Sequence, residues 1–394
     1  MAEAIERAAG MRAGRVYWRS RHDHLYSLEL ADLGRGRPSA AVVYGHWDRY
    51  EPRPPEHEIT ADLLAVSVWV AEIAGSLNPA DVLKVAQFAG VKTGWPEGSF
   101  LRTPEDRFTN LPGFPYEPKY VEVEGLRIAY VEHGDGDPIL LLHGEPTWSY
   151  LYRRMIPPLS AAGRVIAPDL VGFGRSDKPL AANAYTYKSH VRWLRGFIQS
   201  LDLDRITMLC QDWGGLLGLR VLSQIPERFA RVIASNTGLP DGRGQPEAFL
   251  KWRRFSQRVP SLDIARLMRG ALKRQITDAE AAAYAAPFPS PRYQTGARVF
   301  PRLVPIRPED PGAYDNRVAI EKLKTLDLPA LLAWADADPI TAPAEAHLRS
   351  IFRNVAPQLT LKGAGHFIQE DAGEELAAHI LDWMKHAGAV KSRS

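Results

Sequence analysis

The stretch Cys210-Gln-Asp-Trp-Gly-Gly215 decides the expected fold. It follows an apolar run at Ile206–Leu209 and opens another at Leu216–Leu219, which predicts a buried strand, a sharp turn and a helix. At such a turn the central side chain projects above the sheet, and small neighbours allow the turn to close. The glycine pair that ends the motif supplies that space, so Asp212 is expected at the tip.

An aspartate at the tip changes the chemistry that this turn is expected to perform. A serine there attacks acyl carbons, whereas a carboxylate is a competent nucleophile at a saturated carbon that bears a leaving group. Asp212 is therefore expected to break carbon–heteroatom bonds through an alkyl ester with the enzyme.

Composition narrows the class of protein. The chain has 394 residues, 45% hydrophobic and 24% charged, with a formal charge of +3, which is ordinary globular material without a nucleic-acid footprint. Its one cysteine, Cys210, excludes an intrachain disulfide and fits a reducing compartment. The longest uncharged apolar stretch, Leu63–Ala71, is too short to span a bilayer, and Met1–Gly14 lacks a signal-peptide core. A soluble, cytoplasmic protein without membrane or nucleic-acid partners is expected.

The order of apolar runs predicts an α/β fold. From about Pro115 onward strands alternate with helices, which indicates a mostly parallel, twisted sheet covered by helices on both faces. Residues 237–326 interrupt the alternation with proline-punctuated helices rich in aromatic residues. We interpret them as a helical cap over the carboxyl ends of the strands. Residues 101–236 and 327–394 then form an α/β-hydrolase core.

Residues 1–100 do not join this pattern, and we treat them as an N-terminal extension of unknown role. They contain candidate strands at Val16–Leu30 and Ala40–Tyr44 and a candidate helix at Ala61–Ala74. Four histidines there have spacings that match no standard metal site, so we expect them on the surface; they are His22, His24, His46 and His57.

A nucleophilic aspartate needs a base to activate water and an acid to orient that base. His366 fits the base, because it lies in the glycine-rich Gly363–Phe367 directly after the last predicted strand, in the chain order nucleophile, acid, histidine. Asp336 and Asp338 both follow the strand at Pro329–Ala335. We prefer Asp338 as the acid and expect Asp336 to shape the turn.

The remaining polar groups of the site come from two segments. His143-Gly-Glu-Pro146 follows a strand where this fold builds half of its oxyanion hole, so the N–H groups of Glu145 and Trp213 are the expected donors. His143 itself is expected to be structural. The Glu145 side chain either orients the hydrolytic water or forms a loop salt bridge. Indole N–H groups suit a departing halide in a dry pocket; Trp213 is one candidate, and Trp252 is either the second or part of the cap core.

Four motifs together resemble the haloalkane dehalogenases, in the subfamily whose acid follows the strand after the cap. They are His143-Gly-Glu-Pro-Thr-Trp-Ser-Tyr-Leu-Tyr-Arg153, Gly172-Phe-Gly-Arg-Ser-Asp-Lys-Pro179, Gln211-Asp-Trp-Gly-Gly215 and Gly365-His-Phe-Ile-Gln-Glu370. The resemblance covers about residues 101–390. It implies Asp212 as nucleophile, His366 as base, Asp338 as acid, Trp213 and Trp252 as the halide-binding pair, and no metal or organic cofactor. The extension of about one hundred residues, which the family lacks, is either a fused module or upstream sequence read from a misplaced start codon.

Three alternatives remain beside this interpretation. An epoxide hydrolase would use cap tyrosines, for which Tyr284 and Tyr293 are candidates, and a dehalogenase of fluorinated acids would want arginines such as Arg253 and Arg254. A non-catalytic ligand receptor would have no physical requirement to keep Asp212 with a histidine. The main expectation is a hydrolase that converts a haloalkane and water into an alcohol and a halide, acting in detoxification as a monomer.

Overall fold

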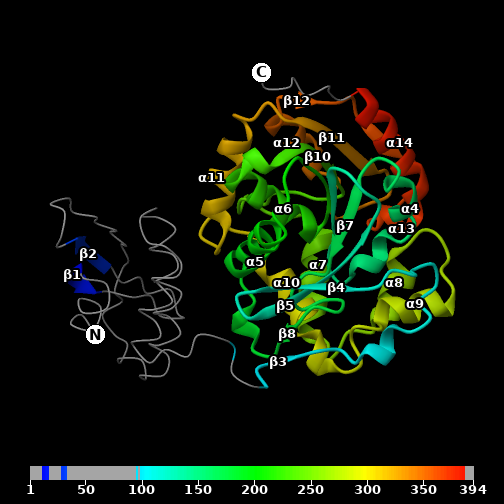
Figure 1. The fold of residues 1–394 in the computed structure, drawn as a ribbon. Coiled ribbons are helices and arrows are strands. Elements are labelled where there is room, and N and C mark those ends of the chain that lie inside the picture. Colours follow the sequence, from blue (N-terminus) through cyan, green and yellow to red (C-terminus); the bar gives the residue numbers. More distant parts are fainter. Residues whose placement is uncertain (1–10, 17–27, 33–94, 96–97, 387–394) are drawn as a thin grey trace. The chain divides into compact units, whose positions relative to one another are not determined.

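The computed structural model describes residues 11–16, 28–32, 95 and 98–386 (Figure 1). The chain divides into two compact units, Met1–Pro96 and Glu97–Ser394. In the described part of the first unit, β1 (Met11–Val16) and β2 (Leu28–Asp32) pair as antiparallel strands with an irregular register between Ala13 and Arg15.

Most of what the sequence predicted for the first unit lies outside the described residues. This holds for the strand at Ala40–Tyr44, the helix at Ala61–Ala74 and the histidines His22, His24, His46 and His57. The strand predicted over Val16–Leu30 is described only at its ends, in β1 and β2.

The described part of the second unit is built on one nine-stranded sheet. Its order is β12-β11-β10-β9-β6-β7-β5-β4, with β13 also paired to β11. The strands are β4 (Lys119–Val123), β5 (Leu126–His133), β6 (Pro138–Leu142), β7 (Arg164–Pro168), β9 (Ile206–Gln211), β10 (Phe229–Ser235), β11 (Pro329–Ala335), β12 (Asn354–Val355) and β13 (Leu359–Leu361). Only the pairs β4–β5 and β5–β7 are antiparallel, so the predicted mostly parallel sheet is confirmed.

The middle strands are buried on both faces, which explains why they read as continuous apolar runs rather than alternating ones. Every residue of β9 is buried, as are Ile139–Leu142 of β6. The β4–β5 hairpin at the sheet edge turns at Glu124 and Gly125, which adopt φ of 51° and 76°. The sheet therefore presents the carboxyl ends of its buried strands to one side, where the site is built.

Helices cover both faces of the sheet (Figure 1). One group that packs together comprises α5 (Tyr187–Ser200), α6 (Trp213–Gln224), α11 (Ala313–Leu323) and α12 (Ala344–Ile351). The other comprises α4 (Ile156–Leu159), α13 (Ile368–Asp371) and α14 (Gly373–His386). Short 3-10 helices connect these elements: η1 (Glu105–Phe108), η2 (Ser149–Tyr152), η3 (Ala182–Ala184) and η4 (Pro226–Arg228). The short strands β3 (Phe100–Leu101) and β8 (Lys178–Pro179) pair with each other in a separate antiparallel sheet.

Between β10 and α11 the chain forms a layer of helices. They are α7 (Glu247–Arg258), α8 (Ile264–Ala271), α9 (Asp278–Ala285), η5 (Pro291–Gln294) and α10 (Thr295–Leu303). Helix α9 begins with a reciprocal capping box between Thr277 and Glu280, which satisfies two N–H groups at its start. All five lie within residues 237–326, the predicted cap. None of the helices in the described ranges is long and apolar enough to cross a membrane.

A buried ionic cluster joins this helical layer to the core. Arg153, directly after η2, donates to both carboxylate oxygens of Glu370 on α13 at 2.5 and 2.8 Å and to Glu280 on α9 at 2.8 Å. The Tyr284 hydroxyl, also on α9, donates to Glu370, and Arg274 bridges Glu280 and Glu370. A buried ion pair needs this many partners to offset its desolvation. The cluster fixes α9 against the segment that follows His366.

The single cysteine lies inside the sheet. Cys210 on β9 is fully buried, and its Sγ lies 3.5 Å from the carbonyl oxygen of Ile233 on the neighbouring strand β10. Burial raises the pKa of its thiol far above the ordinary value, because the thiolate would lose its hydration there. Cys210 is a core residue, as its place in the apolar run indicated.

Candidate active site

The turn between β9 and α6 holds Asp212 in a strained conformation, with φ of 48° and ψ of −125°. Non-glycine residues seldom adopt such angles, and they do so where the surroundings enforce them. A Cβ at Gly214 would lie 2.1 Å from the Leu142 oxygen, and one at Gly215 would lie 2.0 Å from Thr237 Oγ1. The turn therefore closes only with glycines after the aspartate, and it raises the Asp212 side chain above the strand ends.

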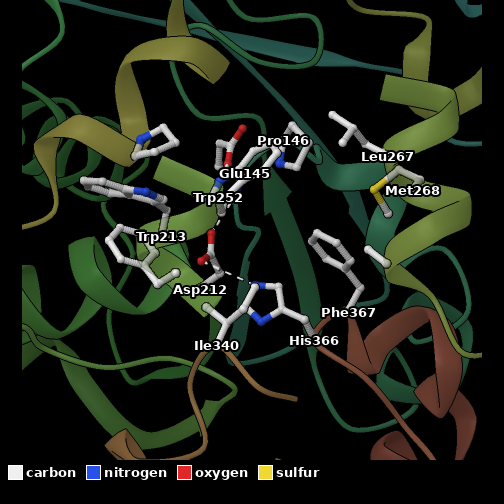
Figure 2. Close-up of a pocket in the computed structure, with 13 residues that line it drawn as sticks. Glu145, Pro146, Asp212, Trp213, Trp252, Leu267, Met268, Ile340, His366 and Phe367 are labelled. Carbon is white, nitrogen blue, oxygen red and sulfur yellow. Dashed lines mark hydrogen bonds and ion pairs between the residues drawn. The ribbon is translucent and has the colours of Figure 1, made fainter. Parts of the chain in front are cut away.

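Three catalytic candidates from separate loops meet at this point, and Figure 2 shows two of them, Asp212 and His366. His366 Nε2 lies 3.5 Å from Asp212 Oδ2, and His366 Nδ1 lies 3.0 Å from Asp338 Oδ2. The ring thus spans the two carboxylates. This geometry suits a base that faces the nucleophile while an acid holds its other nitrogen.

The structure separates the two aspartates that follow β11. Asp338 is buried and accepts from the Ile340 N–H at 2.8 Å and from the Thr341 hydroxyl, in addition to His366. Asp336 instead accepts from the Gly363 N–H at 2.8 Å, with its side chain 36% exposed. Asp338 is therefore the carboxylate in contact with the imidazole, and Asp336 shapes the neighbouring turn.

Opposing effects set the charge of the imidazole. Burial favours neutral His366, but the negative charge of Asp338 and hydrogen bonds to Asp212 and Asp338 outweigh burial and raise its pKa to about 10. Burial likewise opposes ionisation of Asp338, but His366 and the Thr341 and Ile340 donors lower the pKa of that carboxyl to about 2. Both shifts favour an imidazolium that pairs with the Asp338 carboxylate in the free enzyme.

Two amides that the sequence analysis did not select hold the His366 loop. Asn236 Nδ2 donates to the carbonyl oxygens of Gly365 and His366 at 2.9 and 3.0 Å, and its Oδ1 accepts from the Ala335 N–H at 3.0 Å. Gln211 Nε2 donates to the His366 carbonyl oxygen at 3.1 Å. The one feature of the sequence that could have identified them is their position at the ends of β10 and β9, beside the nucleophile.

The loop after β6 contributes a backbone donor to the nucleophile. The Glu145 N–H donates to Asp212 Oδ1 at 2.8 Å, which is one of the two predicted oxyanion contacts. Gly144 approaches so closely that a Cβ there would lie 2.4 Å from the Asp212 Cβ. His143 is fully buried, and its Nε2 accepts from the Leu170 N–H at 2.9 Å, so it packs and supports the loop, as expected.

The two tryptophans reach the site from different layers. Trp213 is the first residue of α6 and is buried between Tyr187 and Phe300, with ring centroids 5.4 and 4.5 Å away. Within residues 98–386 its indole N–H has no hydrogen-bond acceptor. Trp252 lies on α7, and its Nε1 donates to Glu145 Oε2 at 3.1 Å. The structure therefore brings both indoles to the nucleophile.

A cavity of about 140 Å³ lies over Asp212. Besides the catalytic candidates, its walls are mostly apolar: Pro146, Phe249, Leu267, Met268, Ala271, Pro301, Ile340 and Phe367. A second cavity, of about 380 Å³, shares Asp212 and Trp213 and has a more polar rim that includes Asp241, Arg243 and His347. In the described ranges no group of histidine, cysteine and carboxylate side chains has the arrangement of a metal site.

Comparison with known proteins agrees with this geometry. A family profile described as the alpha/beta hydrolase fold matches residues 137–373, and the chain is thus an α/β hydrolase. Haloalkane dehalogenase of Psychrobacter cryohalolentis is 46% identical over 295 residues, which cover 72% of this chain and 97% of that protein. Haloalkane dehalogenase 1 of Mycobacterium tuberculosis is 48% identical over 296 residues, covering 72% and 98%. The chain therefore belongs to the haloalkane dehalogenase family.

Solved structures give the same result. The tetrameric structure of the haloalkane dehalogenase DpaA from Paraglaciecola agarilytica superposes with a TM-score of 0.69 at 39% identity, covering 72% of this chain and 98% of that one. The haloalkane dehalogenase DatA from Agrobacterium tumefaciens superposes with a TM-score of 0.61 at 27% identity, covering 72% and 100%. The α/β-hydrolase fold inferred from the Cys210–Gly215 turn is confirmed.

Proposed function

We propose that this enzyme hydrolyses the carbon–halogen bond of haloalkanes through an ester on Asp212. The observation that carries the proposal is the position of that carboxylate at the floor of an apolar cavity. Its Oδ1 is held by the Glu145 N–H, which leaves Oδ2 to attack the halogen-bearing carbon. The bond from Oδ2 to carbon forms while the carbon–halogen bond breaks, and the electron pair of that bond leaves with the halide.

The departing halide needs donors in a dry environment. Trp213 presents beside the nucleophile an indole N–H that makes no hydrogen bond within residues 98–386, and Trp252 reaches the same cavity from α7. We assign these two N–H groups to the halide. Because both N–H groups belong to large apolar rings, they stabilise the anion while the rings keep the cavity wall apolar and exclude water.

Water then attacks the carbonyl carbon of the ester, and His366 takes its proton. The bond from the acyl carbon to the substrate oxygen breaks, the alcohol leaves with the proton from His366, and Asp212 returns to its carboxylate as the remaining proton passes to solvent. The structure supports a change in the basicity of His366 between the two steps. In the free enzyme Asp212 contributes both a hydrogen bond and a charge that raise the pKa of the imidazole. Esterification removes that negative charge, so the pKa of the imidazole falls. The ring then releases its proton to solvent and can accept the proton of the attacking water. Asp338 remains to stabilise the imidazolium that forms.

The alternatives find less support in the geometry. Tyr284 is fully buried and bonded to Glu370 in the Arg153 cluster, and neither it nor Tyr293 lines the two described cavities. Epoxide opening would need such donors in the cavity. Arg253 donates to the Val304 carbonyl oxygen and Arg254 pairs with Glu247, so neither clamps an acid over Asp212.

We further propose that residues 237–326 act as the cap and that residues 1–100 are an extension of the core formed by 101–236 and 327–394. Halogenated alkanes and water are the proposed reactants, and no metal or organic cofactor takes part in the steps above. The monomeric state, the cytoplasmic location and a role in detoxification stay predictions. Light scattering after gel filtration tests the first, because the related DpaA is described as tetrameric.

A trapping experiment tests the proposed chemistry. His366→Gln keeps the nucleophile and removes the base, so 1,2-dibromoethane should still alkylate the protein while kcat falls by roughly 10²- to 10⁴-fold. Intact-protein mass spectrometry should show one bromoethyl adduct, and peptide mapping should place it on Asp212. A His366→Gln enzyme that turns over without the adduct would contradict the ester.

A further inference from the structure

Glu145 is a buried carboxylate with too few donors. Its side chain lines the cavity over Asp212, and the residue is only 5% exposed. Oε2 accepts one hydrogen bond, from Trp252 Nε1 at 3.1 Å, and Oε1 has no partner within the described residues. An ionised carboxylate in such surroundings is costly, because one indole N–H replaces several water donors.

The charges that face Glu145 also disfavour its ionisation. Asp212 is adjacent, since its Oδ1 accepts the Glu145 N–H, and His366 lies beyond it as the one cationic side chain that lines the described cavity. The helices α7 and α8 present the uncharged Trp252, Leu267 and Met268. Burial and the charge of Asp212 raise the pKa of Glu145 well above its ordinary value, although Trp252 and His366 act in the opposite direction.

Trp252 cannot serve Glu145 and a halide at once. An indole has a single N–H and no other donor, and in this structure that N–H points to Glu145 Oε2 (Figure 2). Trp213 is the indole whose N–H is uncommitted. Half of the proposed halide site is therefore occupied by an acceptor that belongs to the protein.

We propose that Glu145 is a positioning residue that controls the halide site through Trp252, so that halide binding takes up one proton on Glu145 and halide release gives that proton back. This inference rests on the proposed function, because it assumes that Trp213 and Trp252 receive the halide. Charge balances: a carboxylate, a proton and a halide become a carboxylic acid beside a bound halide, and no other bond changes.

Protonation favours the halide in two ways. A carboxylate accepts a hydrogen bond roughly twice as strong as a neutral carbonyl does, so neutral Glu145 releases Trp252 more readily. Neutralisation also removes a negative charge next to the incoming anion. Halide binding is accordingly tight at low pH and weakens as pH rises, while His366, with a pKa of about 10, keeps its proton throughout the neutral range.

Bromide titrations followed by quenching of tryptophan fluorescence test this linkage in the full-length enzyme. Over the pH range in which Glu145 titrates, which lies above the ordinary range of a carboxyl group, the wild-type Kd for bromide should rise by up to about tenfold per pH unit, the slope for one linked proton. Glu145→Gln should remove that slope, because an amide does not ionise. Glu247→Gln is the matched control: Glu247 lies on α7 with Trp252, but its side chain is 60% exposed and paired with Arg254, so the slope should persist.

Direct measurement of proton uptake provides a second test that does not depend on folding of the Glu145 variant. In weakly buffered solution with a pH indicator, the wild type should take up about one proton per bromide bound within that window. His366→Gln should retain the uptake in a window moved to higher pH, because the charge of His366 lowers the pKa of Glu145. Loss of uptake in His366→Gln, or a full slope in Glu145→Gln, would overturn the proposal.

The outcomes also separate this inference from the proposed function. An enzyme that releases bromide from 1,2-dibromoethane but binds bromide equally well at all pH values keeps its function and loses the role of Glu145. An enzyme that neither releases bromide nor binds it at any pH fails on both counts.

Discussion

The core and the helical layer differ in how many contacts hold their site residues in place. In the core, Asp338 is buried with three donors on its carboxylate, and Asn236 and Gln211 fix the His366 loop. In the helical layer, Trp252 lies on α7, where Phe249 and Ser256 are the buried residues, and one hydrogen bond to Glu145 holds its indole.

This difference indicates a division of labour. Bond making and breaking require reacting atoms placed to within fractions of an ångström, and the strained turn and buried carboxylates of the core provide that. Binding and release of a halide require donors that can exchange one acceptor for another. Helix α7 is partly exposed, and it carries the Trp252 N–H, for which Glu145 and the halide compete. Variants of the two regions should therefore differ in both the size and the kind of their effects.

The largest loss is expected at the centre of the core. Asp212→Ala should lower halide release from 1,2-dibromoethane by at least about 10⁴-fold, because no nucleophile remains. A coupled bromide assay measures the loss, and circular dichroism checks that the fold persists. Residual turnover within tenfold of wild type would contradict the proposal that the reaction passes through an ester on Asp212.

Two neighbouring aspartates give a matched pair in the core. Asp338→Asn should lower kcat by roughly 10²- to 10⁴-fold, because the imidazole loses its orienting charge. Asp336→Asn removes a partly exposed carboxylate that bonds to the Gly363 N–H and should stay within a few-fold of wild type. Steady-state kinetics compares them, and equal losses would mean that the contact at 3.0 Å between Asp338 and His366 is not the one that matters.

A smaller effect of another kind is expected on α7. Trp252→Phe keeps the apolar ring and removes one donor to an anion, a loss of about 1.5–3 kcal/mol. Bromide affinity should fall roughly ten- to hundredfold, while kcat for a bromide leaving group changes less than in Asp212→Ala or Asp338→Asn. Unchanged quenching of tryptophan fluorescence by bromide would mean that Trp252 only packs within the helical layer and does not bind the halide.

The most gradual effect concerns stability against pH. His366 has a folded pKa of about 10, above its ordinary value of 6.5, so its protonated form stabilises the fold fully below 6.5, and that contribution is lost as pH rises towards 10. The difference in unfolding free energy between wild type and His366→Gln should shrink over this range, by no more than about 1.4 kcal/mol per pH unit. Urea titrations measure it. A constant difference would show that the core does not hold an imidazolium.

The sequence predicted the local parts of this molecule well. The Cys210–Gly215 turn and the acid and histidine after the last strands follow from apolar runs and glycines that act within a few residues. Chain order then placed Asp212, Asp338 and His366 at the same end of the sheet. The assignment of catalytic roles to them remains a proposal that the variants above test.

Contacts between segments that lie far apart in the chain could not be predicted from the sequence. The Trp252–Glu145 bond joins residues 107 positions apart, and the Arg153–Glu370 pair spans 217 positions, so no local pattern encodes either one. Asn236 could not be selected for a different reason: an amide at a strand end carries no charge, so nothing in the local sequence beyond that place marks it as part of a site. Only the packed fold shows that it holds the loop of the base.

The burial of Cys210 has a practical consequence for work on α7. The chain has one thiol, and it lies inside the sheet with a raised pKa, so maleimides should leave the folded enzyme untouched. A cysteine substituted for Phe255, which is 45% exposed on α7, would then be the single labelled position. A fluorophore or spin label placed there would report the movement of α7 during turnover without any background mutation.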